Sequence, residues 1–341
     1  MRPPIMSRHG VVTSAHYLAS MAGLRVLMDG GNAVDAIVAT AAALNVVEPY
    51  MSGLGGDGLM SITLPGASQP IVLDYSGPAP QDATIDSMTP ERMESGAASM
   101  LVPGAPAGWL IALQRYGTMT PERVFRYAIE LAEDGAPVSF RNTEFINGAA
   151  DRIRSSPQAA ETFLTAGSAP RPGSILRQPR LAHTFRRLVQ RGEREFYDGA
   201  LGHEVVTEVR ASGGLLSEDD LASFQPAWQE PLSIPFHGYE IFSPPPPSAG
   251  IQYLQTIGMF DDDPLPSMGH NSADYLHLLI EAVKLAMADR IAYTLRDDID
   301  HHDLLDPAYL RQRRSAVDMR QAALGPGERF DSPETLDPAS I

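Results

Sequence analysis

Residues 30–58 read GGNAVDAIVATAAALNVVEPYMSGLGGDG and carry the strongest structural signals in the chain. Asn32 is a residue type that caps helix N-termini, and residues 33–47 after it are rich in Ala and Val on every side. A helix that is apolar all round is normally buried, so we expect a core helix there. The glycine loop that follows, residues 53–58, ends this helix and leads into a run with strand character.

The glycine loop matches the spacing of dinucleotide-binding loops at Gly53, Gly55 and Gly58. Such loops follow a strand and open a helix, whose N-terminus then meets the pyrophosphate. Here a helix comes before the loop and a strand after it, so the pattern favours a loop that needs positive φ or a close backbone approach instead. Asp57 within the loop is either a turn former or a side chain directed into a site, and both interpretations stay open.

The order of the remaining elements predicts an α/β fold. Strands are expected at 59–64 and 71–74, joined by a Pro65-Gly66 turn, and as a pair over 231–243. A short strand and a helix are expected over 11–27, with further helices at 109–116, 121–133, 203–211, 217–224 and 271–295. No internal repeat or linker interrupts this order, so we expect one domain over residues 1–341, whose residues 325–341 are polar and extended.

The amino-acid composition excludes several classes of function. The 341 residues include 26 Lys and Arg against 42 Asp and Glu, a net charge of −16, which argues against nucleic acids and anionic membranes as partners. The absence of cysteine excludes thiolate nucleophiles, disulfides and Cys-based zinc sites. Residues 1–10 contain no apolar signal region, and the longest apolar run is interrupted by polar residues, so we expect a cytoplasmic protein with no membrane span.

Two clusters of titratable residues have ordinary explanations. His301, His302 and Asp303 lack a further partner at helical spacing, so a surface loop is favoured over a metal site. On the longest predicted helix, an ion-pair network along one face is the preferred interpretation of the set Glu281, Lys284, Asp289 and Arg290. Lys284 is the only lysine of the chain, so a buried and specific partner for it remains an alternative.

An ordered set of motifs resembles the gamma-glutamyltranspeptidase family. Two of them are Gly30 to Ala36 and Gly53 to Gly58. The others follow in the family's order: Pro103-Gly104, Tyr116-Gly117-Thr118-Met119, Asp134-Gly135, Glu195-Phe196-Tyr197, Gly213-Gly214-Leu215, Asp219-Asp220-Leu221-Ala222, Pro245-Pro246-Pro247-Ser248 and Ala288-Asp289-Arg290. Each motif is weak alone, but the ordered set spans most of the chain.

The resemblance implies a four-layer αββα core of the N-terminal-nucleophile hydrolases, completed by a separate small chain. Members cut themselves ahead of a threonine, so the resemblance implies cleavage after Ile341, with the nucleophile on the partner chain. A threonine at an N-terminus has its own α-amino group as general base, and the reaction requires no cofactor or metal. No catalytic residue is therefore expected in this chain, and whether two large–small pairs associate further stays open.

One position departs from the family pattern. The strand after the glycine loop carries in the family an aspartate, an aromatic residue and an arginine that binds the substrate α-carboxylate, whereas this chain has Asp74, Tyr75 and Ser76. A hydroxyl does not replace a bidentate guanidinium, whose loss costs about 2–5 kcal/mol. We therefore expect hydrolysis of a small carboxylate-bearing amide, of the oxamate type, in a pocket lined by Tyr75 and Ser76 and shaped by the loop around Asp57.

Two alternatives remain. In the first, another arginine, such as Arg92 or Arg115, holds the carboxylate, and the protein is a true gamma-glutamyl transferase or hydrolase acting on glutathione-like substrates. In the second, the protein is an inactive homologue that only binds its ligand. The residue that follows Ile341 separates the second alternative from both enzymes, because threonine or serine is required for catalysis.

Overall fold

The computed structural model describes residues 4–260, 265–296 and 298–323, and it divides into two compact units. The first unit comprises the residues up to Gly58 together with Asp74–Ala227, and the second comprises Leu59–Leu73 and the residues from Trp228 on. Each unit is described by itself below. The single domain expected from the sequence stays a prediction. The segment 325–341 and Ile341 lie outside the described residues.

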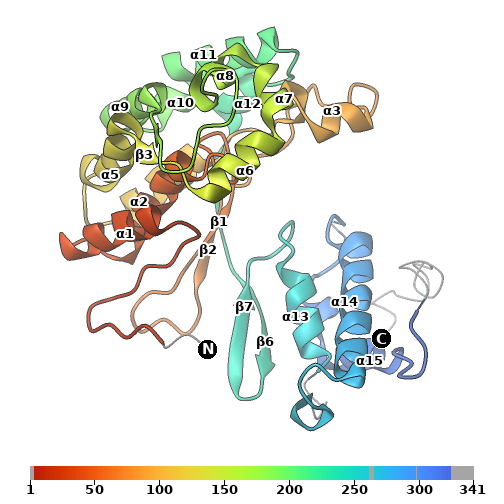
Figure 1. Ribbon diagram of the computed structural model, residues 1–341. Coiled ribbons are helices and arrows are strands. Elements are labelled where there is room, and N and C mark those ends of the chain that lie inside the picture. The colour runs from red at the N-terminus through yellow and green to blue at the C-terminus, as the bar shows by residue number, and fades with distance from the viewer. Residues whose placement is uncertain (1–3, 261–264, 297, 324–341) are drawn as a thin grey trace. The chain divides into compact units, whose positions relative to one another are not determined.

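The first unit is mainly helical. Its helices are α1 (Tyr17–Met28), α2 (Ala33–Val47), α3 (Pro90–Glu94), α4 (Ala105–Tyr116), α5 (Pro121–Asp134), α6 (Phe140–Gly148), α7 (Ala150–Arg154), α8 (Pro157–Phe163), α9 (Pro179–Arg191), α10 (Arg194–Tyr197), α11 (Ala200–Ala211) and α12 (Glu218–Ser223), with a 3-10 turn at Ala97–Ser99. The short strands β3 (Ala136–Pro137) and β4 (Ile175–Leu176) pair antiparallel. The core helix α2 packs against α1 and α5, and α5 packs in turn against α9 (Figure 1).

The predicted cap of α2 is confirmed and extends beyond the helix. The Asn32 side chain accepts hydrogen bonds from the backbone N–H groups of Val34 and Asp35, and Asp35 accepts one from the Asn32 N–H at 2.8 Å. The buried Asp35 carboxylate also accepts from the backbone of Thr118 and Met119 and from the Thr118 hydroxyl. The first motif of the sequence therefore attaches the core helix to the turn after α4.

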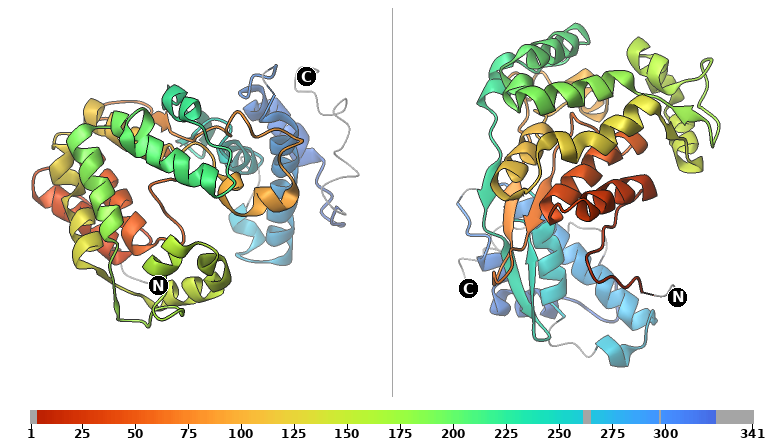
Figure 2. Two further views of the ribbon diagram at one scale, coloured as in Figure 1. Left: turned by 90° about the horizontal axis from the view of Figure 1, so that it is seen from above. Right: turned by 90° about the vertical axis from the view of Figure 1, so that its left-hand side faces the viewer.

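The second unit combines short strands with helices. Strands β1 (Leu59–Ile62), β2 (Ile71–Asp74) and β5 (Ala227–Gln229) form one sheet in that order, and the ends of β2 and β5 reach across the unit boundary. Strands β6 (Leu232–Phe236) and β7 (Tyr239–Ser243) form an antiparallel hairpin, visible in Figure 2. Helices α13 (Gly250–Gly258), α14 (Ala273–Tyr293) and α15 (Pro307–Ser315) follow, with 3-10 turns at Leu265–Met268 and Asp303–Leu305.

The hairpin confirms the predicted strand pair. His237 and Gly238 both have positive φ, 49° and 82°, as a two-residue turn matching the strand twist requires. By contrast, the short strand expected near residue 11 is absent from the described residues. A strand needs a hydrogen-bonded neighbour, and the described chain supplies none there.

The face network expected on the longest helix is only partly correct. Glu281 and Lys284 pair at 2.9 Å, as predicted. Asp289 instead points into the core, where its carboxylate contacts the Arg313 guanidinium at 2.6 Å and accepts hydrogen bonds from Gln255 and Tyr309. Burial raises the pKa of Asp289, and these partners oppose the rise. Arg290 is also not part of the predicted network, because its side chain donates to the Gln252 side chain instead.

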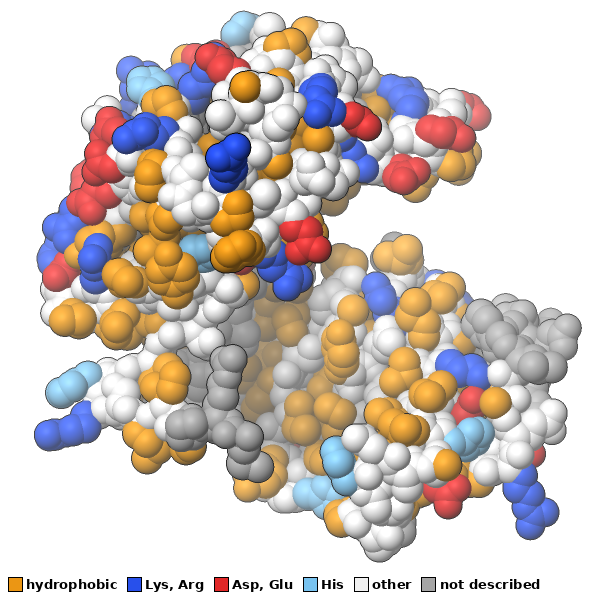
Figure 3. All heavy atoms as spheres, viewed as in Figure 1, with side chains coloured by type: hydrophobic (Ala, Val, Ile, Leu, Met, Phe, Trp, Pro, Cys, Tyr) orange, Lys and Arg blue, Asp and Glu red, His pale blue; other side chains and the backbone are white. Residues whose placement is uncertain are grey.

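Helix α14 is apolar on two opposite faces. Its inner face packs in the core of the second unit through Leu278, Ala282 and Leu285. Its outer face carries side chains that are 38–68% exposed and that recur at helical spacing: Leu276, Ile280, Val283, Met287 and Ile291. We call these five residues the outer stripe, and Figure 3 shows hydrophobic side chains gathered over this region. An amphipathic helix that buries only one face would carry polar side chains on its outer face.

A comparable stripe lies on α1 in the first unit. Its exposed members are also spaced as neighbours on one helix face: Tyr17, Met21, Leu24 and Met28. Contiguous exposed apolar faces are typical of surfaces that bind another molecule. Within the described ranges, no helix has the length and apolar content that crossing a membrane requires.

Candidate active site

The glycine loop starts from a fixed point at the C-terminus of α2. The last carbonyls of a helix have no partner within the helix. Here the Val46 carbonyl accepts a hydrogen bond from the Gln178 side chain at 2.7 Å, and the Val47 carbonyl accepts one from Asn142 at 2.9 Å. The preceding residue, Asn45, donates to the Ser52 hydroxyl at 2.6 Å, which orients the start of the loop.

Backbone hydrogen bonds fix the rest of the loop. The Gly56 carbonyl accepts from the N–H groups of Gly104 and Ala105, both at 2.9 Å, and the Gly58 carbonyl accepts from Tyr75 at 3.0 Å. Gly104 and Ala105 stand at the N-terminus of α4, where no side-chain cap is present. The loop therefore satisfies N–H groups that the helix cannot satisfy itself.

Tyr75 lies where the loop and α4 meet. Its side chain is buried, with 9% of the residue exposed. A Cβ atom built on Gly104 would stand 1.7 Å from the Tyr75 carbonyl oxygen, and one on Gly108 would stand 2.3 Å from the ring. A Cβ on Gly58 would stand 2.9 Å from the hydroxyl. Close approach to Tyr75 thus explains glycine at these positions, and of the two explanations expected for the loop, Gly58 fits close approach rather than positive φ.

The Tyr75 hydroxyl is held in its protonated form. Burial raises the pKa of Tyr75, the Trp109 indole N–H lowers it, and the negative charge of Asp57 raises it further. The buried Trp109 N–H itself has no acceptor with standard hydrogen-bond geometry among the described residues. A protonated hydroxyl donates a hydrogen bond, so Tyr75 is suited to orient an acceptor rather than to act as a base.

Ser76 and Asp57 complete the predicted set. The Ser76 N–H donates to the Asp74 carboxylate at 2.8 Å, which fixes the turn directly after β2. Ser76 is half-buried, whereas Asp57 is exposed on the loop. The structure brings Asp57 and Tyr75 close enough for the carboxylate to affect the Tyr75 pKa. Their roles toward a substrate remain predictions.

Tyr197 supports the site in a way that the sequence did not reveal. Its buried hydroxyl donates to the Pro103 carbonyl at 2.7 Å and accepts from the Ala107 N–H at 3.2 Å. Burial raises the pKa of Tyr197, so the hydroxyl keeps the proton that it donates. The motif that contains Tyr197 is part of the family resemblance. No local sequence signal reveals the contact itself, because its partners are about 90 residues apart in the chain.

The two arginines considered as carboxylate ligands have other partners. Arg92 donates to the backbone carbonyls of Ser87 and Gly213. The Arg115 guanidinium stands 5.1 Å from the centre of the Tyr116 ring. Neither contact involves Tyr75 or Ser76.

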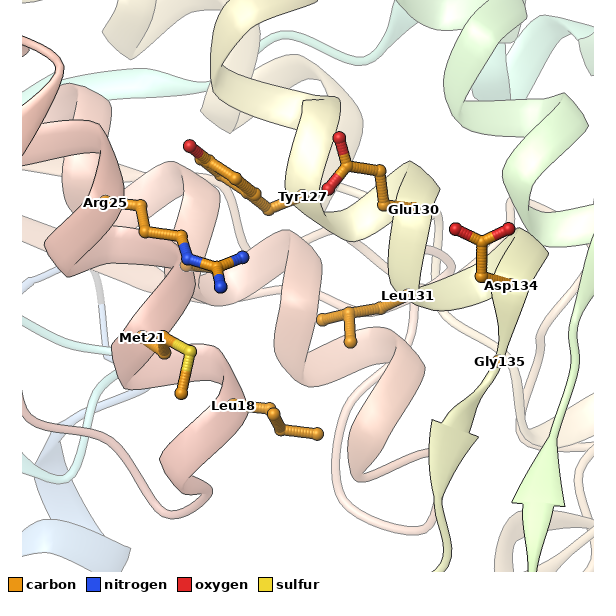
Figure 4. Close-up of a pocket in the computed structure, with 9 residues that line it drawn as sticks. Leu18, Met21, Arg25, Tyr127, Glu130, Leu131, Asp134 and Gly135 are labelled. Atoms are coloured by element: carbon orange, nitrogen blue, oxygen red, sulfur yellow. The ribbon is translucent and has the colours of Figure 1, made fainter.

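Other candidate ligand sites lie away from Asp57, Tyr75 and Ser76. Among the described residues, no three His, Cys, Asp or Glu side chains gather as metal ligands. His302 lies in an exposed turn, where it pairs with Asp300 at 2.8 Å. A cavity of about 240 Å³ lies between α1 and α5, where Leu18, Met21 and Leu131 provide apolar contacts and Arg25 stands over the Tyr127 ring (Figure 4). No predicted site residue lines it.

Comparison with known proteins identifies the family. The gamma-glutamyltranspeptidase family model matches residues 19–337. The chain belongs to this family. The fold agrees as well, because the structure matches the gamma-glutamyltranspeptidase of Helicobacter pylori with a TM-score of 0.89 and 29% identity, covering 97% of this chain and 100% of that chain. The predicted fold class, the α/β core of the N-terminal-nucleophile hydrolases, is thereby confirmed.

Relatives within the gamma-glutamyltranspeptidase family have diverse names. The acylase ACY 1 proenzyme of Pseudomonas sp. (strain SE83) is 35% identical, over 97% of this chain and 63% of the relative. The oxamate amidohydrolase proenzyme of Klebsiella pneumoniae is 34% identical, over 95% and 64%. The glutathione hydrolase proenzyme of Escherichia coli is 30% identical, over 94% and 57%. The chain thus spans less than two thirds of the length of these curated relatives.

Proposed function

We propose that this chain is the large subunit of an autoprocessed amidohydrolase that acts on a small carboxylate-bearing amide of the oxamate type. The observation that carries the proposal is Ser76, which offers a neutral hydroxyl where the family pattern has a carboxylate-binding arginine. Arg92 and Arg115 hold other partners, which disfavours a substitute guanidinium. A relative named as an oxamate amidohydrolase is about as similar to this chain as one named as an acylase.

The catalytic threonine would be supplied by a small chain from the same proenzyme. The relatives are named as proenzymes and extend well beyond the matched region. The exposed apolar stripes of α1 and α14 support such a partner, because each is a surface that a free chain would leave unpaired. Maturation would begin when the threonine hydroxyl adds to the Ile341 carbonyl carbon. The C–N bond breaks, the hydroxyl proton ends on the new α-amino group, and water then hydrolyses the ester.

The proposed catalytic cycle uses the same threonine. Its hydroxyl attacks the substrate amide carbonyl, the α-amino group takes the proton and returns it to the leaving ammonia, and water hydrolyses the acyl-enzyme. Tyr75 would orient the acyl group through its protonated hydroxyl, beside Ser76. The loop around Asp57 would form the wall of the pocket. The cytoplasmic location expected from the sequence remains part of the proposal, and cell fractionation checks it.

Two substrates assayed in parallel test the proposal. The purified two-chain enzyme, with complete cleavage confirmed by intact mass, receives oxamate in one reaction and a gamma-glutamyl anilide in the other. We expect ammonia from oxamate and little aniline. Rapid aniline release by the wild type would instead establish a gamma-glutamyl enzyme. If neither substrate reacts after full cleavage, the oxamate assignment is wrong.

A substitution at position 76 tests the residue itself. Ser76→Arg restores a guanidinium and should raise aniline release at least about tenfold, because a bidentate carboxylate contact is worth about 2 kcal/mol or more. Oxamate hydrolysis should fall in the same variant. Ser95→Arg, a change at an exposed serine of the same unit, is the matched control. Unchanged rates for both substrates would remove Ser76 from the pocket.

A further inference from the structure

Three side chains of α14 hold the segment that follows α15. His277, Glu281 and Lys284 are spaced four and three residues apart, so they lie on one face of the helix. His277 Nε2 donates to the Asp318 carbonyl at 2.9 Å. Glu281 and Lys284 reach the last described residue, Ala323. This polar face lies beside the outer stripe and is separate from it.

Glu281 and Lys284 bind both backbone groups of Ala323. Lys284 Nζ donates to the Ala323 carbonyl at 2.6 Å, and the Ala323 N–H donates to Glu281 Oε2 at 3.3 Å. The other Glu281 oxygen pairs with Lys284 at 2.9 Å, so the three groups form a closed set, which we call the Ala323 anchor. Because it contacts only backbone, the anchor fixes the position and direction of the chain.

Burial makes the Ala323 anchor more than a surface ion pair. The Glu281 side chain is 7% exposed and that of Lys284 is 26% exposed. A buried carboxylate requires compensating partners, and here these are an ammonium and a backbone N–H. Residues 318–322 are exposed, whereas Ala323 is half-buried, so the chain returns to the helix surface at this residue.

We propose that Glu281 and Lys284 are positioning residues for self-cleavage, because they fix the point from which residues 324–341 lead to the scissile bond. This inference rests on the proposed function. Holding Ala323 reduces the number of residues between a held position and the scissile bond from 26, counted after Ser315, to 18, and loop-closure entropy for such a reduction favours ring closure only about 1.7-fold. The larger contribution is orientation, since the reacting atoms must meet within about 3–3.5 Å.

Paired substitutions in the full-length proenzyme test the anchor. Lys284→Met keeps the apolar stem and removes the donor, so the first-order rate of self-cleavage should fall about two- to tenfold. Lys284→Arg keeps a donor and should restore most of the rate. Ala323→Pro removes the N–H that Glu281 binds and should slow cleavage as Lys284→Met does, whereas Ala323→Ser should not. Once cleaved, every variant should hydrolyse substrate with an unchanged kcat.

Two further measurements separate positioning from general stability. Asp151→Asn breaks another i,i+3 pair, that with Arg154, and should leave the cleavage rate unchanged. Lys284 is the only lysine of this chain, so amine labelling read by peptide mass spectrometry reports the anchor directly; Ala323→Pro should increase its labelling severalfold, and Ala323→Ser should not.

The outcomes are distinguishable. If the wild-type proenzyme does not cleave itself, both the proposed function and the positioning role of Glu281 and Lys284 are overturned. If the wild type cleaves itself, and Lys284→Met and Ala323→Pro do so at the same rate, only the role of the Ala323 anchor is overturned. Two results together would show that Glu281 and Lys284 have only a structural role. The cleavage rate would stay low in Lys284→Arg, and across the variants it would fall in proportion to the loss of melting temperature.

Discussion

Contacts between individual atoms determine which residue types fit beside Tyr75. Three glycines let other backbone approach Tyr75 so closely that a methyl group at Gly104 would overlap its carbonyl oxygen and one at Gly108 would overlap its ring. Neither glycine has a positive φ, so space rather than backbone conformation requires glycine here. The residue type is therefore set by a neighbour that is distant in sequence.

Gly108→Ala should destabilise the protein even though it lies within helix α4. Alanine normally stabilises a helix interior by about 1 kcal/mol relative to glycine. Here the new methyl would stand 2.3 Å from the Tyr75 ring, and overpacking of this kind costs about 1–3 kcal/mol. Urea unfolding measures the difference. Gly148→Ala, at the end of α6 with nothing within 4 Å of the new atom, is the control and should not destabilise.

His16 should make stability depend on pH. Its Nδ1 accepts the Leu18 N–H and caps α1, and burial lowers the pKa of His16 while Glu48 opposes the shift. A lowered folded-state pKa means that this stabilisation is complete above the ordinary value of about 6.5 and is lost as the pH falls through the folded pKa. His16→Asn keeps the cap without titrating. Melting temperatures at pH 7.5 and 5.0 should therefore differ less in the variant, and an equal difference would contradict this role.

At the scale of elements, polar side chains connect helices that apolar contacts alone would leave free to shift. Asp35 joins the start of α2 to the turn after α4, and Gln178 and Asn142 hold its end. The core helix is thus fixed at both ends, and the glycine loop begins from a defined position.

Asp35→Ala should be among the most damaging single substitutions in the first unit. The change removes a charged acceptor from several donors in partly buried hydrogen bonds, each worth about 1.5–3 kcal/mol. We expect a loss of at least about 3 kcal/mol in the free energy of unfolding, or failure to accumulate folded protein. Asp306→Ala removes an exposed helix cap on α15 and should cost only about 1 kcal/mol.

Elements with local causes could be predicted from the sequence. The Asn32 cap, the His237-Gly238 turn and the length of α14 follow from residues that lie beside one another. The inward turn of Asp289 toward Arg313 and the contact of Tyr197 with Pro103 could not, because their partners are far away in the chain. The strand expected near residue 11 was wrong for the related reason that strand pairing is not a local property.

At the scale of the whole molecule, the outer stripe of α14 is the surface on which the proposed small chain would complete the core. Burying a side chain such as Ile280 is worth about 1.5–3 kcal/mol, so the stripe represents substantial unused stabilisation.

Ile280→Asp and Ile291→Asp should leave the second unit folded but weaken its association with the proposed small chain at least about tenfold each. A charge would have to be buried in the interface, in addition to the lost apolar contact. Retention of the small chain on an affinity-tagged large chain during dilution measures this. Ile85→Asp, at a fully exposed site in the first unit, is the control, and equal retention in all variants would mean that the stripe faces solvent.

The interleaving of the two units has a consequence for biosynthesis. Strand β2 lies beside β5 in one sheet, yet about 150 residues separate them in the chain. At a translation rate of about 5–20 residues per second, the ribosome delivers β5 about 8–30 seconds after β2. Throughout that interval the nascent chain presents an uncovered strand edge, which makes chaperone contact during synthesis an expected requirement of this topology.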